Sequence, residues 1–196
     1  MTKFPKIIQD GDIELVKLEP TFENAQRAFE LIDRNRAHLG RWEFWPAGIK
    51  NAEGQFNALV KKYDDADGTF WILYKGELAG SAGIRQIDPV CKSGNIGYWL
   101  GAEFTGRGIA TRAAKTLEDL AFGTMDFNRL AIIMDDENKK SVAVAQRLGY
   151  KLDGIMRDDS LRSDGTIGNS CVYSKLKREW QSEEKKIIKQ PEKLTF

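Results

Sequence analysis

The sequence predicts an α/β fold in which one mixed, twisted sheet of about seven strands has flanking helices. Runs rich in β-branched and aromatic residues alternate with runs whose apolar residues recur at helical spacing. Two β-rich runs flank Lys75-Gly76 as in an antiparallel hairpin, and a strand, a glycine-spaced loop and a helix follow one another in "GNIGYWLGAEFTGRGIATRAA", residues 94–114. The 196 residues, 41% of them hydrophobic, can bury one sizeable core, so residues 1–180 are expected to form a single domain.

The first half of the chain supplies a strand, two helices and a hairpin. "IELVKL" (13–18) reads as a strand, and residues 22–35 carry apolar side chains every three to four positions, as in an amphipathic helix. Proline and glycine interrupt the aromatic segment "HLGRWEFWPAG" (38–48), which predicts a loop or a short broken helix. Another helix is expected over about 52–63, before the hairpin of residues 69–87.

The second half adds a buried strand, a helix and two closing strands. "RLAIIM" (129–134) reads as the buried strand, and "NKKSVAVAQRLGY" (138–150) as a helix that a glycine stops. The segments "KLDGIMRD" (151–158) and "NSCVYSKLKREW" (169–180) are expected as strands about a turn-rich stretch. The charged tail, residues 181–196, is expected to extend the last helix or to be disordered.

Composition excludes several classes of protein. Thirty basic and 29 acidic side chains give a net charge of +1, so no basic surplus argues for a nucleic-acid partner. No apolar run approaches membrane-spanning length and none resembles a signal-peptide core, so we expect a cytoplasmic protein without a membrane partner. Cys91 and Cys171 lie far apart without a C-x-x-C pair, which predicts two free thiols. His38 is the only histidine, so no histidine-based metal centre is expected.

The loop before the helix in residues 94–114 has the features of an anion site. The first turn of a helix presents N–H groups without acceptors, together with a partial positive charge. In "TGRGIAT" (105–111), Gly106 and Gly108 let the backbone come close to a ligand, and Arg107 adds a full charge. Such a loop suits a pyrophosphate.

Three readings of this loop compete on the residues alone. A Walker P-loop is excluded, because no Gly-Lys-Ser/Thr occurs in the chain. A dinucleotide fingerprint matches G-x-G and an acidic Asp135 after the next strand, but Thr111 occupies the place of the third glycine. A glycine loop that binds no ligand is the third reading.

The same loop is similar to that of the GNAT acetyltransferases, Q/R-x-x-G-x-G/A, with Thr105 in place of Gln or Arg. Further segments extend the likeness over about residues 10–180: "RAHLGRWEFW", "IGYWL", "GRGIATRAA", "NRLAI", "ENKKSVAVAQRLGY", "DGIMRD" and "VYSKLKREW". Together they resemble the ribosomal-protein serine/alanine N-acetyltransferase branch of that superfamily. The resemblance implies a GNAT fold whose sheet is splayed between strands 4 and 5.

This resemblance also implies a coenzyme site. Acetyl-CoA would lie in the splay, with its pyrophosphate on the glycine loop and its pantetheine amide paired to the strand end. The residues assigned to it are Leu100, Gly101, Thr105, Gly106, Arg107, Gly108, Ile109, Ala110, Thr111, Asn138 and Ser141. From the residues alone, Asn138 reads equally as a helix N-cap and Ser141 as an ordinary first-turn residue.

For the chemistry, the resemblance implies that Ser141 lies beside the sulfur and protonates the departing thiolate, while a main-chain N–H near Leu100 points at the thioester oxygen. Asp159 is the candidate base, with Asp158, Ser160, Glu103 and His38 as other candidates and water as a further possibility. The acceptor slot is assigned to His38, Trp42, Trp45 and Glu103.

The expected reaction is acetyl transfer from acetyl-CoA to an amine, with a protein N-terminal α-amine as the first candidate. A small-molecule amine or antibiotic is the alternative acceptor, because a fold does not choose its substrate. A non-catalytic acyl-CoA-binding regulator is the other alternative. The resemblance also implies a possible homodimer and no metal.

Overall fold

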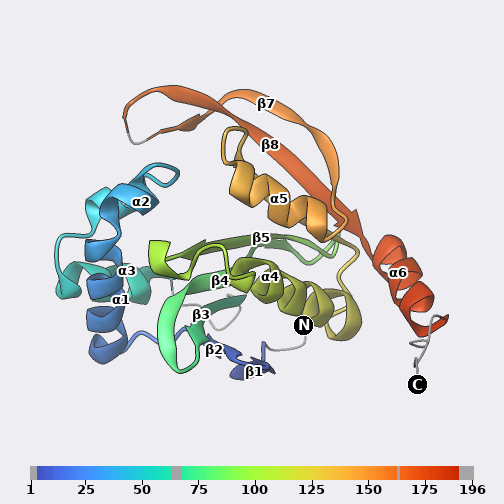
Figure 1. The fold of residues 1–196 in the computed structure, drawn as a ribbon, viewed down its shortest axis with the longest axis horizontal. Helices are drawn as coiled ribbons and strands as arrows, with labels where there is room; N and C mark the ends of the chain where they lie inside the picture. The colour runs from blue at the N-terminus through green and yellow to red at the C-terminus, as the bar shows by residue number, and fades with distance from the viewer. Residues whose placement is uncertain (1–3, 63–67, 163, 190–196) are drawn as a thin grey trace, which may run out of the picture.

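The computed structural model describes residues 4–62, 68–162 and 164–189, and these form one mixed sheet with helices around it (Figure 1). The sheet has eight strands in the order β1-β2-β3-β4-β5-β6-β8-β7. Their bounds are β1 Ile7–Asp10, β2 Ile13–Lys17, β3 Gly68–Tyr74, β4 Glu77–Asp88, β5 Ser93–Leu100, β6 Arg129–Asp135, β7 Lys151–Leu161 and β8 Ile167–Leu176.

All neighbouring strands are antiparallel except β5 and β6. These two pair in parallel only at Ser93–Asn95 with Arg129–Ala131. Beyond that point they diverge, so the predicted splay is confirmed. The splay lies between strands 5 and 6 instead of 4 and 5, because the prediction missed β1. That strand has four residues, too few for an alternating pattern to be visible.

The helices confirm most of the predicted elements. Their bounds are α1 Phe22–Arg34, α2 Arg36–Gly40, η1 Trp45–Gly48, α3 Ala52–Lys62, η2 Ala102–Phe104, α4 Ile109–Asp119, η3 Leu120–Thr124, α5 Lys139–Arg147 and α6 Lys177–Lys189. Thr21 caps α1, since its side chain accepts the N–H of Asn24 at 3.2 Å. The aromatic segment forms α2 and η1, as the expected broken helix. Residue 63, the predicted end of α3, lies outside the described residues.

One prediction about the C-terminal part was wrong. The last strand ends at Leu176, and residues 177–180 begin α6 instead of continuing β8. Glu179 explains the change, because its carboxylate accepts the N–H of Leu176 at 3.0 Å at the start of the helix. Trp180 packs on Phe122 with ring centroids 6.0 Å apart and so fixes α6 to the body. Residues 181–189 extend this helix, while a separate tail over 181–196 remains a prediction.

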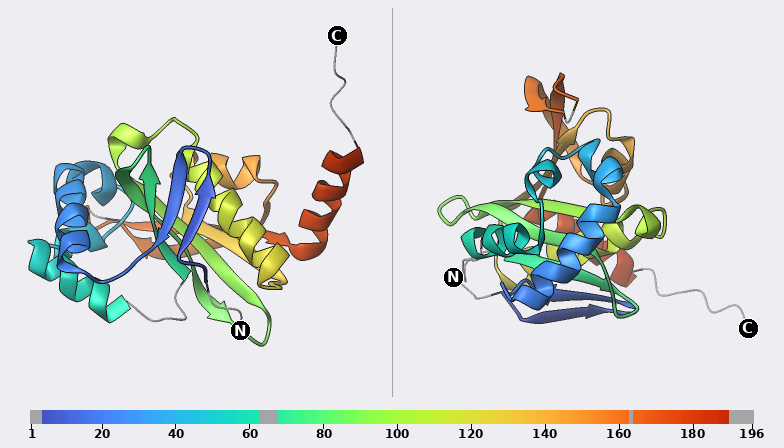
Figure 2. Two further views of the ribbon diagram at one scale, coloured as in Figure 1. Left: turned by 90° about the horizontal axis from the view of Figure 1, so that it is seen from below. Right: turned by 90° about the vertical axis from the view of Figure 1, so that its left-hand side faces the viewer.

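The layers position the splay at the centre of the molecule. Helix α4 packs on β4 and β5 and also contacts α5, and the long β7–β8 hairpin arches past α5 (Figures 1 and 2). One apolar core lies between sheet and helices, with Phe70, Phe122 and Ile72 fully buried. Burying each such side chain contributes about 1.5–3 kcal/mol. Both cysteines are free thiols, as predicted. In the described residues no helix is long and apolar enough to cross a membrane.

Candidate active site

A cavity of about 690 Å³ lies where β5 and β6 diverge. Its wall comes from α2, β5, the loop before α4, the first turn of α4, the end of β6, and α5. Most of the predicted site residues line it: His38, Trp42, Leu100, Thr105, Gly106, Gly108, Ile109, Ala110, Thr111, Asn138 and Ser141. Folding thus brings together three segments that are remote in the sequence, residues 38–42, 100–111 and 138–141.

The glycine loop is shaped to approach an anion. Gly106 and Gly108 have φ of +76° and +75°, a conformation that side chains with a Cβ rarely adopt. No heavy atom lies within 4 Å of the position that a Cβ would take at either residue, so the loop backbone is open to a ligand. Gly108 also precedes α4, whose first intrahelical hydrogen bond runs from Arg112 N–H to Gly108 O at 3.0 Å. The N–H groups of residues 109–111 therefore have no intrahelical acceptor.

Two loop residues are placed differently from the expectation. Arg107 is exposed and does not line the cavity, and its guanidinium lies 5.9 Å from the ring centre of Tyr74. The Thr105 hydroxyl donates to the Ala102 carbonyl at 2.8 Å, so it stabilises the η2 turn. An anion at this loop would therefore meet main-chain N–H groups more than side chains.

The end of β5 offers main-chain groups to the cavity. Gly101 N–H donates to Ala79 O of β4 at 2.9 Å, so this N–H is not available to a ligand. Hydrogen-bonding direction alternates along a strand, and the β4–β5 register is regular from Gly80↔Leu100 onward. The main-chain groups of Leu100 and Tyr98 therefore point away from β4, into the gap beside β6. Leu100 fits the predicted strand-like pairing, whereas Gly101 does not supply its N–H.

A tyrosine that the sequence did not single out, Tyr98, lies beside Ser141 in the cavity wall. Tyr98 Oη lies 2.9 Å from Ser141 Oγ, and either oxygen can donate. Asn138 caps α5, because its side-chain oxygen accepts Ser141 N–H at 3.2 Å. Burial raises the pKa of Tyr98 to about 12, although the hydrogen bond with Ser141 works against this shift. Tyr98 is therefore protonated at neutral pH.

The predicted acceptor residues divide into two groups. His38 and Trp42 line the cavity; burial and the charge of Lys140 lower the pKa of His38, although the backbone of Leu100 and the charge of Glu103 oppose the shift. Trp45 lies outside the lining and packs on Trp99 with ring centroids 5.6 Å apart.

Glu103 also lies outside the lining. Burial opposes its ionisation, but hydrogen bonds from its own backbone, Arg34 and Asn35 outweigh burial and lower its carboxyl pKa. Asn35 is 4% exposed and was not singled out from the sequence. Its Oδ1 accepts Ala102 N–H at 2.8 Å, and its Nδ2 donates to Glu103 at 3.1 Å, so α1 is fixed to the end of β5.

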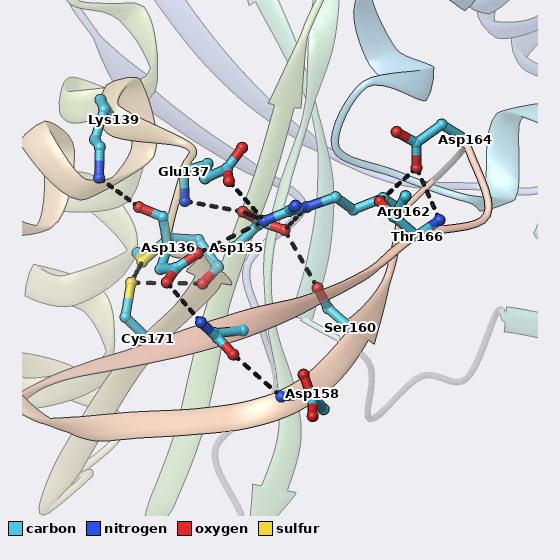
Figure 3. A network of polar contacts seen from close by, with 12 residues as sticks. Asp135, Asp136, Glu137, Lys139, Asp158, Ser160, Arg162, Asp164, Thr166 and Cys171 are labelled. Carbon is cyan, nitrogen blue, oxygen red and sulfur yellow. Dashed lines mark hydrogen bonds and ion pairs between the residues drawn. The ribbon is translucent and has the colours of Figure 1, made fainter.

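The candidate base Asp159 is exposed on β7 and is not brought to the cavity. A register shift between Met156 and Ser160 changes how the β7 side chains are directed, which a simple strand pattern does not reveal. Two carboxylates line the cavity, Glu43 and Asp135, and Ser160 Oγ donates to Asp135 at 3.3 Å (Figure 3). Among the described residues no three His, Cys, Asp or Glu side chains converge as a metal site.

A family model described as "Acetyltransferase (GNAT) domain" matches residues 14–151, well over half of the chain. The chain belongs to the GNAT acetyltransferases. The "Putative ribosomal N-acetyltransferase YdaF" of Bacillus subtilis (strain 168) is 36% identical over 171 residues, which cover 85% of this chain and 92% of that protein.

Other similar members of the family act on different acceptors, as their names state. The spermidine N(1)-acetyltransferase of Escherichia coli (strain K12) is 28% identical over 71% of this chain and 74% of that protein. The ribosomal-protein-serine acetyltransferase of the same organism is 27% identical over 77% of this chain and 87% of that protein. The structure of the microcin C7 self immunity acetyltransferase MccE, in complex with acetyl-CoA and AMP, has a TM-score of 0.77 and 29% identity, covering 85% of this chain and 93% of that one. The family is thus certain, and the acceptor differs among its members.

Proposed function

We propose that this acetyltransferase moves the acetyl group of acetyl-CoA to a protein N-terminal α-amine, as ribosomal-protein acetyltransferases do. The observation that carries the proposal is the cavity in the splay, which has a helix N-terminus at one part of its wall and the Ser141–Tyr98 pair at another. The likeness to two ribosomal-protein acetyltransferases supports the acceptor class. Such acceptors also suit a cytoplasmic enzyme; a homodimer remains a prediction that one chain does not test.

The residues present fit acetyl-CoA. The N–H groups of residues 109–111 and the open backbone of Gly106 and Gly108 suit its pyrophosphate. The main-chain groups of Leu100 suit the pantetheine amide, which would pair as an added strand. A dinucleotide site is less well supported, because β5 is antiparallel to β4 and parallel only to a short part of β6.

The transfer needs little from the protein beyond positioning and a proton. The amine nitrogen attacks the thioester carbonyl carbon, the C–S bond breaks, and the thiolate takes up the hydroxyl proton of Ser141. Tyr98 returns a proton to Ser141 Oγ through their 2.9 Å contact and is reprotonated from solvent. Holding both reactants in one cavity can supply up to about 7–11 kcal/mol. A thiol with a pKa near ~8.5 leaves readily, so the acid makes a smaller contribution.

The amine must lose a proton, and we assign this step to water. Asp159 and Glu103 do not line the cavity, and the hydrogen bonds to Glu103 stabilise its charged form. Asp135 lines the cavity, but hydrogen bonds from Arg162 lower its pKa, so it is a weak base.

A polyamine is the second candidate acceptor. Two carboxylates, Glu43 and Asp135, line the cavity and could attract a cationic amine, and one relative acts on spermidine. This second candidate predicts that spermidine is a better substrate than an N-terminal peptide.

Turnover with a panel of acceptors decides between them. Peptides that begin with Ser or Ala, the same peptides with a blocked N-terminus, and spermidine are compared by release of the free coenzyme thiol. We expect kcat/KM for the free peptides to exceed that for spermidine by about tenfold or more, with no turnover of the blocked peptides. A preference for spermidine would reverse the ranking, and thiol release from no amine at all would refute catalysis.

A further inference from the structure

The turn of the β7–β8 hairpin is fastened to the end of β6 by one arginine. Arg162 Nε and Nη2 donate to the two oxygens of Asp135 at 2.8 and 3.1 Å, a fork-like contact (Figure 3). Ser160, two residues earlier, donates to the same carboxylate at 3.3 Å. The Asp135 side chain is 6% exposed and lines the cavity, so the hairpin reaches the cavity wall through this residue.

A second set of contacts continues from Asp135 toward Ser141 on α5. Its carboxylate accepts Glu137 N–H at 2.9 Å, and its carbonyl accepts Asn138 N–H at 3.0 Å. Asn138 in turn accepts Ser141 N–H, so the turn after β6 sets the position of the first residues of α5. These bonds lie within one turn and one cap, and none of them uses a residue of the hairpin. Arg162 therefore controls where the hairpin lies, and the turn itself controls Ser141.

Further carboxylates surround the guanidinium of Arg162 and hold it in place. Asp136 and Glu137 carboxylates lie 3.7 and 3.3 Å from Nη2, beyond the two bonds to Asp135. Asn169 of β8 donates to Asp136 at 3.0 Å and accepts Asp158 N–H at 3.1 Å. Without the guanidinium, the carboxylates at the end of β6 would repel one another, and the hairpin would lose its strongest contact there.

We propose that Arg162 is a positioning residue that holds the β7–β8 hairpin across the end of β6 through Asp135, and that the part of the cavity wall fixed in this way, Asp135 with Ser170 of β8, faces the acceptor amine. The assignment to the acceptor rests on the proposed amine acetylation. Neither Arg162 nor the hairpin turn belongs to the glycine loop or to the end of β5, where the coenzyme is placed. Loss of the contact between Arg162 and Asp135 should therefore weaken acceptor binding and leave coenzyme binding intact.

The test measures acceptor KM, kcat and acetyl-CoA affinity in Arg162→Gln, Asp135→Asn and the double variant. We expect each single variant to raise acceptor KM about tenfold, with kcat and the coenzyme Kd within about twofold of wild type. Both changes break the same contact. The acceptor KM of the double variant should therefore be no higher than that of the single variant with the larger effect. Arg162→Lys should recover only part of the loss, since an ammonium cannot make the forked contact.

Arg157→Gln is the matched control, because Arg157 is exposed on β7, the strand that leads to Arg162, and the described residues show no ion pair for it. An acceptor KM that stays near wild type in Arg162→Gln would overturn the proposal. So would a parallel loss of coenzyme affinity, or additive losses in the double variant. If Arg162→Gln does not fold, Ser160→Ala removes a weaker bond to the same carboxylate and should raise acceptor KM about twofold to threefold; an unchanged KM there overturns the proposal.

Hydrogen exchange separates this proposal from the proposed function. In Arg162→Gln the amides of residues 157–162 should exchange about tenfold faster than in wild type, and Arg157→Gln should not change them. If the wild-type protein acetylates no amine, the acceptor role falls with the function, yet the positioning of the hairpin by Arg162 is still tested by this exchange. Unchanged exchange in Arg162→Gln would refute that positioning itself.

Discussion

At the residue scale, the contact between Ser141 and Tyr98 supports the proposed catalytic role of Ser141 over the role of an ordinary first-turn serine. A first-turn serine needs no tyrosine, and the hydroxyl contact at 2.9 Å joins α5 to β5 across the cavity. Since burial keeps the Tyr98 phenol protonated, the pair holds two hydroxyl protons beside one another. Ser141 is therefore suited to donate its proton to a thiolate and to receive a proton from Tyr98.

Replacement of Ser141 by Ala tests this pairing. As a helix residue alone, the change should alter stability by a few tenths of a kcal/mol at most, because both residues suit a helix. As the proton donor, it should lower kcat by about 10- to 100-fold, the low end of general-acid effects, because the thiolate leaves readily. Acetyl-CoA affinity, measured by calorimetry, should stay near wild type.

An acyl donor with a more acidic thiol gives the internal control for Ser141→Ala. Its thiolate needs protonation less, so the loss of kcat should shrink. A variant with wild-type kcat at saturating acceptor would remove Ser141 from the mechanism, and a loss of coenzyme affinity alone would make it a binding contact.

At the scale of elements, local patterns were predictable and long-range pairings were not. Gly106, Gly108 and the start of α4 are neighbours in the chain, so spacing alone predicted a glycine loop that leads into a helix N-terminus. Tyr98 and Ser141 are 43 residues apart, and Asp135 and Arg162 are 27 apart. Whether such pairs meet depends on how β5, β6 and β8 align, which one sequence does not reveal.

The misplaced elements have local physical causes. The prediction of Asp159 as a base followed the resemblance, which implies a carboxylate just after this strand, whereas β7 continues to Leu161 and shifts register between Met156 and Ser160. The prediction of strand over 177–180 followed the apolar residues and overlooked the cap that Glu179 supplies to α6.

The loop before α4 is tested by replacement of Gly108 with Val. A branched side chain at φ of +75° is strained and would also stand where the open backbone meets the ligand. We expect acetyl-CoA affinity, measured by calorimetry, to fall about tenfold or more, with a cost in stability of about 1–2 kcal/mol.

Gly154→Val is the matched control for the loop. Gly154 lies on the exposed strand β7, and no heavy atom lies within 4 Å of the position of its Cβ. This variant should bind acetyl-CoA as wild type does. Undiminished binding by a folded Gly108→Val protein would exclude the loop as the coenzyme site.

At the scale of the whole molecule, a buried charge cluster ties four parts of the fold together. Lys175 of β8 is 1% exposed and donates to Leu148 O at 2.7 Å and to Glu118 of α4 at 3.3 Å. It also contacts the Glu183 carboxylate of α6. Lys115 lies 3.6 Å from Glu118, at the more exposed side of the cluster. These residues lie outside the cavity lining, so the cluster stabilises the frame rather than the chemistry.

The charge on Glu118 makes this frame sensitive to pH. Burial raises the pKa of Glu118 above 4.5, although Lys175 and Lys115 oppose the shift. A carboxyl that binds its proton more tightly in the folded state stabilises the fold fully below its unfolded pKa. This contribution is then lost as pH rises through the folded pKa. The cations therefore matter most at the pH values at which Glu118 is charged.

Replacement of Lys175 by Met should destabilise the fold in a way that grows with pH. At pH 7 we expect a loss of about 3 kcal/mol in the free energy of unfolding, the low end for a broken buried pair, because Lys115 remains near Glu118. Near pH 4 the loss should be smaller, since Glu118 can then be neutral. Denaturant unfolding at both pH values measures the difference. The double variant Lys175→Met, Glu118→Gln should lose this pH dependence. If Lys175→Met lowers the free energy of unfolding equally at both pH values, or if the double variant is destabilised as much as Lys175→Met, then packing around Lys175 rather than its charge stabilises the frame.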